Sequence, residues 1–158
     1  MSEMIDVSVA IAAPKEAAWA VLADYGNVHT YVRGILNAYL TTEQASGVGM
    51  TRYCALPRMM MMKQYIVEEI TAWDEGRSFT YIITDAAAPI TDAWVAWSVE
   101  GDDRRSKIRA RVSYRPKGVM GRLMLPMMRK QFPKQMNAAL ADLKQHLEAH
   151  VMAPAKAA

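Results

Sequence analysis

The chain has too few cysteines for a disulfide bond or a cysteine-based metal site. Cys54 is the single cysteine among its 158 residues, so an internal disulfide is impossible and no cysteine cluster can bind zinc. The longest stretch without Asp, Glu, Lys or Arg is residues 34–42, whereas a membrane-spanning helix needs about twenty apolar residues. The first residues carry acids rather than the basic start of a secretory signal. We therefore expect a cytoplasmic protein without a transmembrane segment.

Acidic residues are absent from one long segment of the chain. Residues 104–134 contain eleven Lys and Arg and no acid, whereas residues 1–103 contain six Lys and Arg against fourteen Asp and Glu. Along one predicted strand the cations alternate, so they share its outward face: Arg105, Lys107, Arg109 and Arg111. No nucleic-acid-binding motif and no interleaved aromatics accompany them, which argues against a nucleic-acid partner. We interpret the stripe as a solvated face that pairs with acids on neighbouring strands, with a protein or membrane-surface partner as the alternative.

The overall composition is that of one globular domain. Hydrophobic residues make up 52% and charged residues 22% of the chain, which is too apolar for a disordered protein. A chain of this length buries roughly two-thirds of its unfolded surface, so it needs no metal or disulfide to fold. We expect a single domain over residues 1–152 and a disordered tail over 153–158. The sequence does not determine the oligomeric state.

Apolar side chains alternate in the pattern of β-strands over much of the chain. Residues 5–12 form the first predicted strand, followed by a helix over 15–24 and a short helix around 27–31. Residues typical of turns separate six further predicted strands, near 35–42, 48–56, 61–73, 77–84, 91–100 and 104–115. Because the connections are short, we expect the strands to form an antiparallel meander.

The apolar period becomes helical after Gly118. One stripe at spacings of three or four runs along the predicted helix: Met120, Met124, Met128, Phe132, Met136, Leu140, Leu143 and Leu147. Pro126 and Pro133 interrupt this stretch. Each removes a backbone donor and crowds the carbonyl four residues earlier, so we expect kinks or a break.

Short motifs follow the order of these elements. They are Ala13-Pro14 with Trp19 and Leu22-Ala23-Asp24, Gly47-x-Gly49-x-x-Arg52, Glu68-x-Ile70-x-x-x-Asp74 followed by Phe79-x-Tyr81, Tyr114-x-Pro116-x-Gly118, and Leu140-x-x-Leu143-Lys144. With them, nearly the whole chain resembles the START/polyketide-cyclase-like (SRPBCC) superfamily. The resemblance implies an α+β helix-grip fold: a seven-stranded antiparallel curved sheet wrapped around a long C-terminal helix, with two short helices after the first strand. Members carry lipids, bind hormones, cyclise polyketides or assist other proteins, so the fold alone leaves the function open.

The strand faces predicted to point toward the long helix are apolar with a few polar groups, as in most ligand sites. The resemblance implies a cavity there, between the sheet and the C-terminal helix. The candidate ligand-binding residues are Arg52, Cys54, Glu68, Tyr81, Ile83, Trp97, Tyr114, Met120, Met124 and Met128. Methionines suit a pocket for varied apolar shapes, although a methionine stripe at helical spacing is also typical of plain core packing.

Arg52 and Glu68 are the charged members of this set. Each interrupts an otherwise apolar strand face, where an isolated charge is costly. We expect the two either to neutralise each other or to hold the polar end of a ligand. Strand parity leaves Glu69 as an alternative to Glu68, and the resemblance favours Glu68.

We interpret the chain as a module that binds a small hydrophobic molecule, lipid or aromatic and polyketide-like, without a cofactor. The alternative is a polyketide cyclase or dehydratase, in which Arg52 or Tyr81 stabilises an oxyanion and Glu68 transfers protons. A protein or membrane-surface adaptor that uses the basic strand is the third hypothesis. No metal site is expected, because His146 and His150 lie four residues apart without a third ligand.

Overall fold

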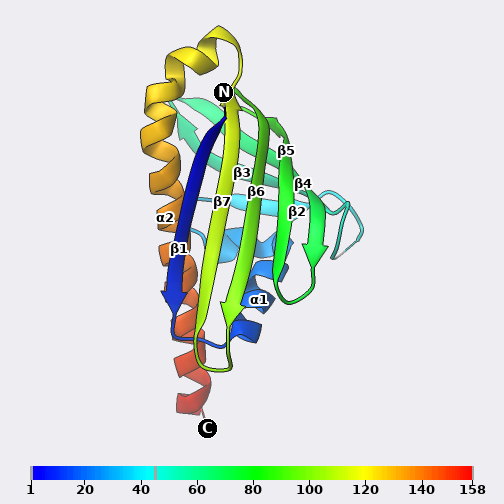
Figure 1. The fold of residues 1–158 in the computed structure, drawn as a ribbon, viewed down its shortest axis with the longest axis vertical. Coiled ribbons are helices and arrows are strands. Elements are labelled where there is room, and N and C mark those ends of the chain that lie inside the picture. The colour runs from blue at the N-terminus through cyan, green and yellow to red at the C-terminus, as the bar shows by residue number, and fades with distance from the viewer. Residues whose placement is uncertain (1, 45, 158) are drawn as a thin grey trace.

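In the computed structural model, which describes residues 2–44 and 46–157, one strand leads into two short helices, six further strands and a long helix (Figure 1). Side chains are described up to residue 150. In chain order the elements are β1 (Glu3–Ile11), α1 (Lys15–Ala23), the 3-10 helix η1 (Tyr25–Thr30), β2 (Asn37–Leu40), β3 (Thr51–Met59), β4 (Met62–Asp74), β5 (Ser78–Ala86), β6 (Ile90–Gly101), β7 (Ser106–Pro116) and α2 (Gly118–Ala157).

The seven strands of the described chain form one antiparallel sheet in the order β1-β7-β6-β5-β4-β3-β2. Consecutive strands from β2 to β7 are neighbours, and β1 closes the other edge by pairing with β7. The strand β2 is shorter than its predicted span of 35–42, because it is an edge strand and pairs with β3 only over Asn37–Leu40. The structure confirms the predicted α+β helix-grip arrangement with its antiparallel meander.

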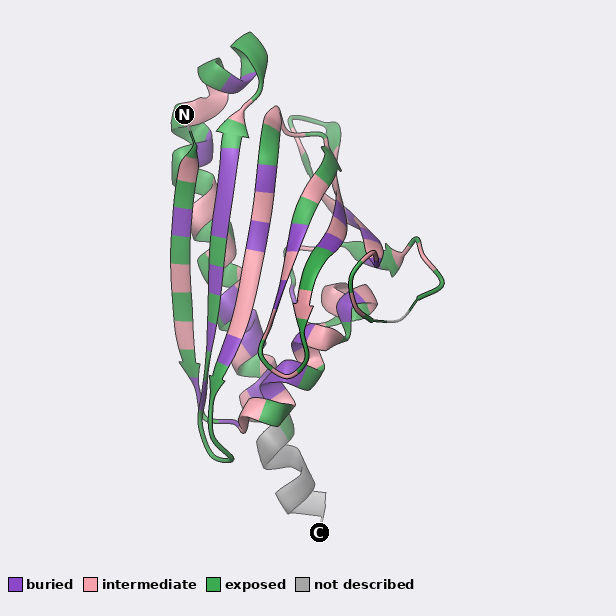
Figure 2. Cartoon of the chain, turned by 45° about the vertical axis from the view of Figure 1, so that its right-hand side comes forward, coloured by how far each residue is buried: buried purple, intermediate pink, exposed green. Residues whose placement is uncertain are grey.

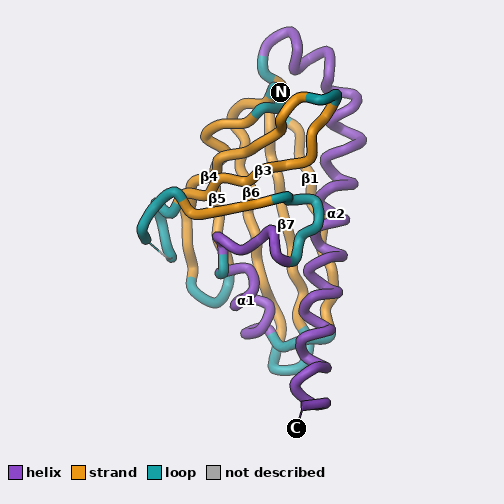
Figure 3. Tube along the Cα trace, turned by 180° about the vertical axis from the view of Figure 1, so that it is seen from behind, coloured by secondary structure: helices purple, strands orange, loops and turns teal. Residues whose placement is uncertain are grey.

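All three helices lie on one side of the sheet (Figure 3). Helix α2 runs alongside β1 and β7, α1 packs against β6 and β7, and η1 packs against β2 and β3. Figure 2 shows buried and exposed positions alternating along β7, as expected when one strand face meets the helices and the other meets solvent. The outward face of β7 carries the predicted basic stripe, and Arg109 pairs there with Asp6 of β1.

Helix α2 bends but does not break. It is a single helix from Gly118 to Ala157 in which both Pro126 and Pro133 are accommodated. Figure 1 shows its first turns, in yellow, lying across the top of the molecule before the helix turns down along β1. A bend in the first part of α2 agrees with the predicted kink, because a proline lacks a backbone donor that the helix needs. The alternative prediction, a break in the helix, is wrong.

The end of the fold next to the C-terminal half of α2 has a closed core. Leu140, Leu143 and Leu147 of α2 are buried there in one hydrophobic cluster with α1. Trp19 of α1 packs edge-on against Trp73, with 5.2 Å between the ring centroids. Fully burying a large apolar side chain contributes about 1.5–3 kcal/mol, so these residues stabilise the end of the fold opposite the bend in α2.

Asp142 ties the loop after η1 to α2. This buried carboxylate accepts hydrogen bonds from the backbone nitrogen of Arg33 at 2.9 Å and from its Nε and Nη2 at 3.0 and 2.7 Å. Burial raises the pKa of Asp142, but the hydrogen bonds from Arg33 together with its charge outweigh burial and hold the pKa below its usual range. The contact fixes one end of η1 against α2, and η1 in turn carries a residue of the candidate site.

The predicted tail over 153–158 falls on residues whose side chains lie outside the described part, together with all of Ala158. The domain limit at residue 152 stays a prediction. None of the described helices combines the length and the hydropathy that crossing a bilayer requires.

Candidate functional site

Arg52 and Glu68 form a buried ion pair across two neighbouring strands. They are direct partners in the register of β3 and β4, and their exposed fractions are 5% and 1%. Arg52 Nε donates to Glu68 Oε2 at 2.7 Å, and Arg52 Nη2 donates to the same oxygen. The two charges therefore neutralise each other, which is one of the two expected arrangements, and Glu69 lies on the opposite face of β4.

Tyr25, the first residue of η1, completes this cluster. Its hydroxyl donates to Glu68 Oε2 at 3.1 Å, and its carbonyl accepts from Arg52 Nη1 at 2.8 Å. The central carbon of the guanidinium lies 3.6 Å from the centroid of the Tyr25 ring and 5.5 Å from that of Tyr81, within the range of cation–π attraction. Each of the three guanidinium nitrogens has an acceptor inside the protein, which leaves one further N–H on Nη1 and one on Nη2.

Burial and charge together set the protonation of the cluster. Burial lowers the pKa of Arg52, but the charge of Glu68 and the neighbouring Tyr25, Cys54 and Tyr81 together outweigh burial, and the net pKa is raised. Burial, reinforced by Glu68, raises the pKa of Tyr25 and of Tyr81 above that of an ordinary phenol. Burial also raises the pKa of the Cys54 thiol to about 12. At neutral pH, Arg52 is therefore a cation, both phenols are neutral and Cys54 is a protonated thiol rather than a nucleophile.

Apolar side chains of β5, β6 and the first half of α2 form a set that is only partly buried, called here the part-exposed apolar layer. Its members pack against the buried core but keep part of their area accessible to solvent: Ile83, Ile90, Trp97, Met124, Leu125, Phe132 and Met136. Met128, between Met124 and Phe132 on the same helix stripe, is buried. These apolar side chains are therefore incompletely covered in the protein alone.

Tyr114 of β7 contributes a buried hydroxyl without a partner. The residue is 1% exposed, and among the described residues no group forms a hydrogen bond with its hydroxyl. Its ring packs edge-on against Phe132 of α2, with 5.0 Å between the centroids. Burial, followed by the charge of Glu3, raises the pKa of Tyr114, so the hydroxyl stays protonated and able to donate. A buried hydroxyl without a partner costs about 1–3 kcal/mol, so an unmade hydrogen bond at this position needs an explanation.

The structure divides the predicted ligand-binding residues into three groups. Arg52, Cys54, Glu68 and Tyr81 lie together in the buried cluster. Residues of the second group belong to the part-exposed layer or border it: Ile83, Trp97, Tyr114, Met124 and Met128. Met120 stands apart and is exposed, because the first turns of α2 bend away from the sheet.

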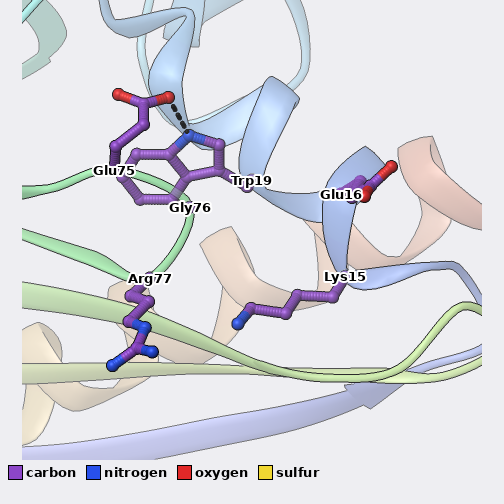
Figure 4. Close-up of a pocket in the computed structure, with 6 residues that line it drawn as sticks. All are labelled: Lys15, Glu16, Trp19, Glu75, Gly76 and Arg77. Carbon is purple, nitrogen blue, oxygen red and sulfur yellow. Dashed lines mark hydrogen bonds between the residues drawn. The ribbon is translucent and has the colours of Figure 1, made fainter.

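Two pockets of the described chain lie outside the predicted ligand-binding residues. One, of about 300 Å³, lies between the start of α1 and the β4–β5 turn and is lined by Lys15, Glu16, Trp19, Glu75, Gly76 and Arg77 (Figure 4). The other, of about 340 Å³, lies between η1 and β2. In the first, Glu75 accepts a hydrogen bond from the Trp19 indole at 2.9 Å and another from the Trp73 indole at 2.7 Å. Glu75 thus joins α1 to the β4–β5 hairpin.

Sequence reasoning missed Tyr25. No spacing or motif distinguishes it, because it enters the site only through the way η1 folds back over β3. Phe132 and Met136 were part of the predicted helix stripe, and that stripe was the signal for their place in the apolar layer.

The histidines do not form a metal site within the described residues. His146 and His150 stack with 4.0 Å between ring centroids, but no group of three potential ligands occurs in the described part of the chain.

Residues 3–148 match the family model described as polyketide cyclase / dehydrase and lipid transport. No curated protein matches the chain. Several solved structures have the same fold. The Zhui aromatase/cyclase from Streptomyces sp. R1128 superposes with a TM-score of 0.84 at 15% identity, over 96% of each chain.

Two further structures are similar at comparable identity. A protein of Thermus thermophilus has a TM-score of 0.78 at 14% identity, covering 94% of this chain and 99% of that one. A START superfamily protein from Mycobacterium smegmatis has a TM-score of 0.75 at 13% identity, covering 92% and 97%. At these identities the structures establish the fold.

Proposed function

The chain belongs to the polyketide cyclase / dehydrase and lipid transport family, within the START-like superfamily, and on this premise we propose that it binds a small hydrophobic molecule between its sheet and helix α2. The observation that carries the proposal is the part-exposed apolar layer. Large apolar side chains of β5, β6 and α2 pack against the core and remain incompletely covered in the protein alone. A ligand that covers them gains about 25 cal/mol for each Å² of apolar surface removed from water, before ordering costs.

The residues that we propose to contact the ligand come from both surfaces. Ile83 and Trp97 of the sheet and Met124 of α2 supply apolar contact, and Met128 lies behind them. Tyr114 supplies a polar anchor, because its buried hydroxyl has no partner among the described residues. A ligand oxygen that reaches this hydroxyl would satisfy it. We therefore propose an apolar ligand that carries a carbonyl or hydroxyl group.

Arg52, Glu68, Cys54 and Tyr81 have a different role in this proposal. Their polar groups form hydrogen bonds within the protein or are deeply buried. These four residues therefore form the base of the site beneath the ligand, called here its floor. Only Tyr81, which faces the guanidinium with its ring and adjoins Trp97, borders the apolar layer from this floor.

A polyketide cyclase or dehydratase is the second candidate function. It is supported by the similarity to the Zhui aromatase/cyclase and by the buried Arg52, Glu68 and Tyr81. Such chemistry needs a donor for a developing oxyanion and a group that transfers protons. In this chain three of the five N–H groups of Arg52 already have acceptors, and the side chain is buried, which favours binding over catalysis.

One experiment separates the two functions. Purified protein is incubated with a panel of fatty acids, sterols, flavonoids and aromatic poly-ketones, and the recovered protein and the supernatant are analysed by mass spectrometry. A panel member that stays bound with unchanged mass supports the binding function. A dehydrated or cyclised product supports the enzyme. If nothing is bound and nothing is converted, both proposals are wrong.

Three variants test where the ligand lies. Met124→Trp fills the apolar layer and is expected to abolish uptake, whereas Met127→Trp, on the exposed side of the same helix, is the matched control and is expected to bind normally. Tyr114→Phe removes only the hydroxyl. It should therefore lower the affinity for a carbonyl-bearing ligand by about tenfold or less and leave the affinity for a pure hydrocarbon unchanged. Equal binding by Met124→Trp and the wild-type protein would place the ligand elsewhere.

A further inference from the structure

Three connections gather at one end of the molecule. Because the sheet is antiparallel, the β3–β4 turn, the β5–β6 loop and the β7–α2 junction all lie at the same end, at the top of Figures 1 and 3. The junction is fixed in place, since Lys117 N donates to the carbonyl of Pro89 at 2.8 Å. Gly121 packs against the same loop so closely that a Cβ there would lie 2.7 Å from the Pro89 oxygen. The start of α2 is thus held rigidly at this end.

The β3–β4 turn presents two methionines to solvent in a costly conformation. Met59 pairs with Met62, which leaves Met60 and Met61 as a two-residue turn with φ values of 51° and 67°. Turns of this kind strongly prefer Asn-Gly, because positive φ crowds an ordinary side chain. The two methionines are 87% and 86% exposed, so no packing within the chain offsets that cost.

The first turns of α2 expose a second set of apolar side chains. Val119 and Leu123 are 82% and 73% exposed, and Met120 is also exposed. They occupy adjacent positions on less than two turns of helix, and Met124 and Leu125 follow them toward the interior. Large apolar side chains gathered at one end in this way are uncommon on a surface that meets only water.

Cations without acidic partners surround these apolar groups. Four exposed basic residues flank the turn and the start of α2, and none of them forms an ion pair within the described part of the chain: Arg58, Lys63, Lys117 and Arg122.

The acids toward this end have partners of their own. Glu3 pairs with Arg129, Asp92 pairs with Arg115, and Asp85 accepts a hydrogen bond from Tyr65. Tyr65 is a neutral partner for Asp85, but the four cations without ion pairs in the described chain outnumber this one acid, so positive charge dominates the surface around the exposed apolar side chains.

We propose that this end docks onto the surface of an anionic lipid bilayer. Met60 and Met61 at the turn and Val119, Met120 and Leu123 on α2 enter the boundary between headgroups and acyl chains, where their burial is favourable. The flanking cations contact anionic headgroups, each adding to the attraction. The exposed apolar side chains of the β3–β4 turn and of the start of α2 are surrounded by cations, and this arrangement fits a fluid, negatively charged surface. The inference does not depend on the ligand-binding function proposed above.

Sedimentation with vesicles tests the proposal. The wild-type protein is expected to bind vesicles of phosphatidylcholine mixed with phosphatidylglycerol at least about tenfold more tightly than vesicles of phosphatidylcholine alone, and added salt should weaken this binding. The double variant Met60→Asn with Met61→Gly gives the turn its preferred residues while removing both apolar tips. It should lose at least about tenfold in affinity while unfolding at a higher temperature than the wild type. Its loss of binding then cannot come from misfolding.

Charge reversal supplies a matched pair. Arg122→Glu lies at the proposed docking end, and Arg104→Glu makes the same change in net charge at the β6–β7 turn, at the opposite end of the sheet. We expect Arg122→Glu to weaken binding to the anionic vesicles and Arg104→Glu to leave it nearly unchanged. Met124→Trp, which fills the interior, should bind vesicles normally. No binding to either vesicle, equal binding to both, or equal losses in the two charge variants would overturn the proposal.

Discussion

The guanidinium of Arg52 lies over the ring of Tyr25, with 3.6 Å from its central carbon to the ring centroid, and it also donates to the carbonyl of the same residue. One side chain of the sheet thus holds both the ring and the backbone of the first residue of η1. Because Glu68 binds the other nitrogens of Arg52, the position of η1 depends on a buried ion pair.

Removing one partner of this pair should destabilise the protein strongly. Arg52→Met leaves Glu68 buried without its cation, and we expect a loss of about 3–5 kcal/mol in the free energy of unfolding. The double variant Arg52→Met with Glu68→Met removes both charges and should be more stable than Arg52→Met alone. Urea unfolding followed by tryptophan fluorescence measures both. The buried pair would be contradicted if the double variant lost as much free energy of unfolding as Arg52→Met and Glu68→Met lose in sum.

Cys54 should be inert toward thiol reagents in the folded protein. It is fully buried, and its pKa is raised to about 12, so little thiolate exists at pH 8 and none of it is accessible. We expect no labelling by maleimide in native buffer and complete labelling of one thiol in denaturant. Rapid labelling of the native protein would show that the floor of the site opens readily.

Asp142 should make stability depend on acid pH. Its pKa is lowered in the folded protein, so its contribution is present above the ordinary carboxyl pKa and is lost as pH falls through the folded value. Between pH 7 and about pH 3 the wild type should therefore lose more stability than Asp142→Asn. Arg33→Met removes the cause of the lowered pKa, so the stability of this variant should depend less on pH over the same range. Identical pH profiles for wild type and both variants would contradict this role for the contact.

The hydrogen bonds from the two indoles to Glu75 should be detectable through tryptophan fluorescence. Hydrogen bonds from Trp73 and then from Trp19 lower the pKa of Glu75, so its carboxylate persists to lower pH than that of an ordinary glutamate. Tryptophan emission is expected to change as pH falls through this lowered value, and the change should be absent in Glu75→Gln. A transition that survives the substitution would have to come from another group.

Much of the fold follows from local patterns in the sequence. Alternating apolar residues determine the strands, because a half-buried sheet needs period two, and short turns determine that neighbouring strands are antiparallel. The stripe from Met124 to Leu147 determines which face of α2 packs inward. The cost of an isolated buried charge also made the pairing of Arg52 with Glu68 predictable.

Other features depend on contacts between segments far apart in the chain, which no local pattern records. The place of Tyr25 beneath Arg52 depends on how η1 folds back over β3, and the exposure of Met120 depends on the bend at the start of α2. The partnerless Tyr114 hydroxyl is likewise visible only once β7 and α2 are packed together. By itself, then, the sequence determined the periodicity of each element and the residues that need burial. Only the tertiary structure decided which polar groups meet, which lack partners and which apolar side chains stay in water, because these depend on how the elements pack in space.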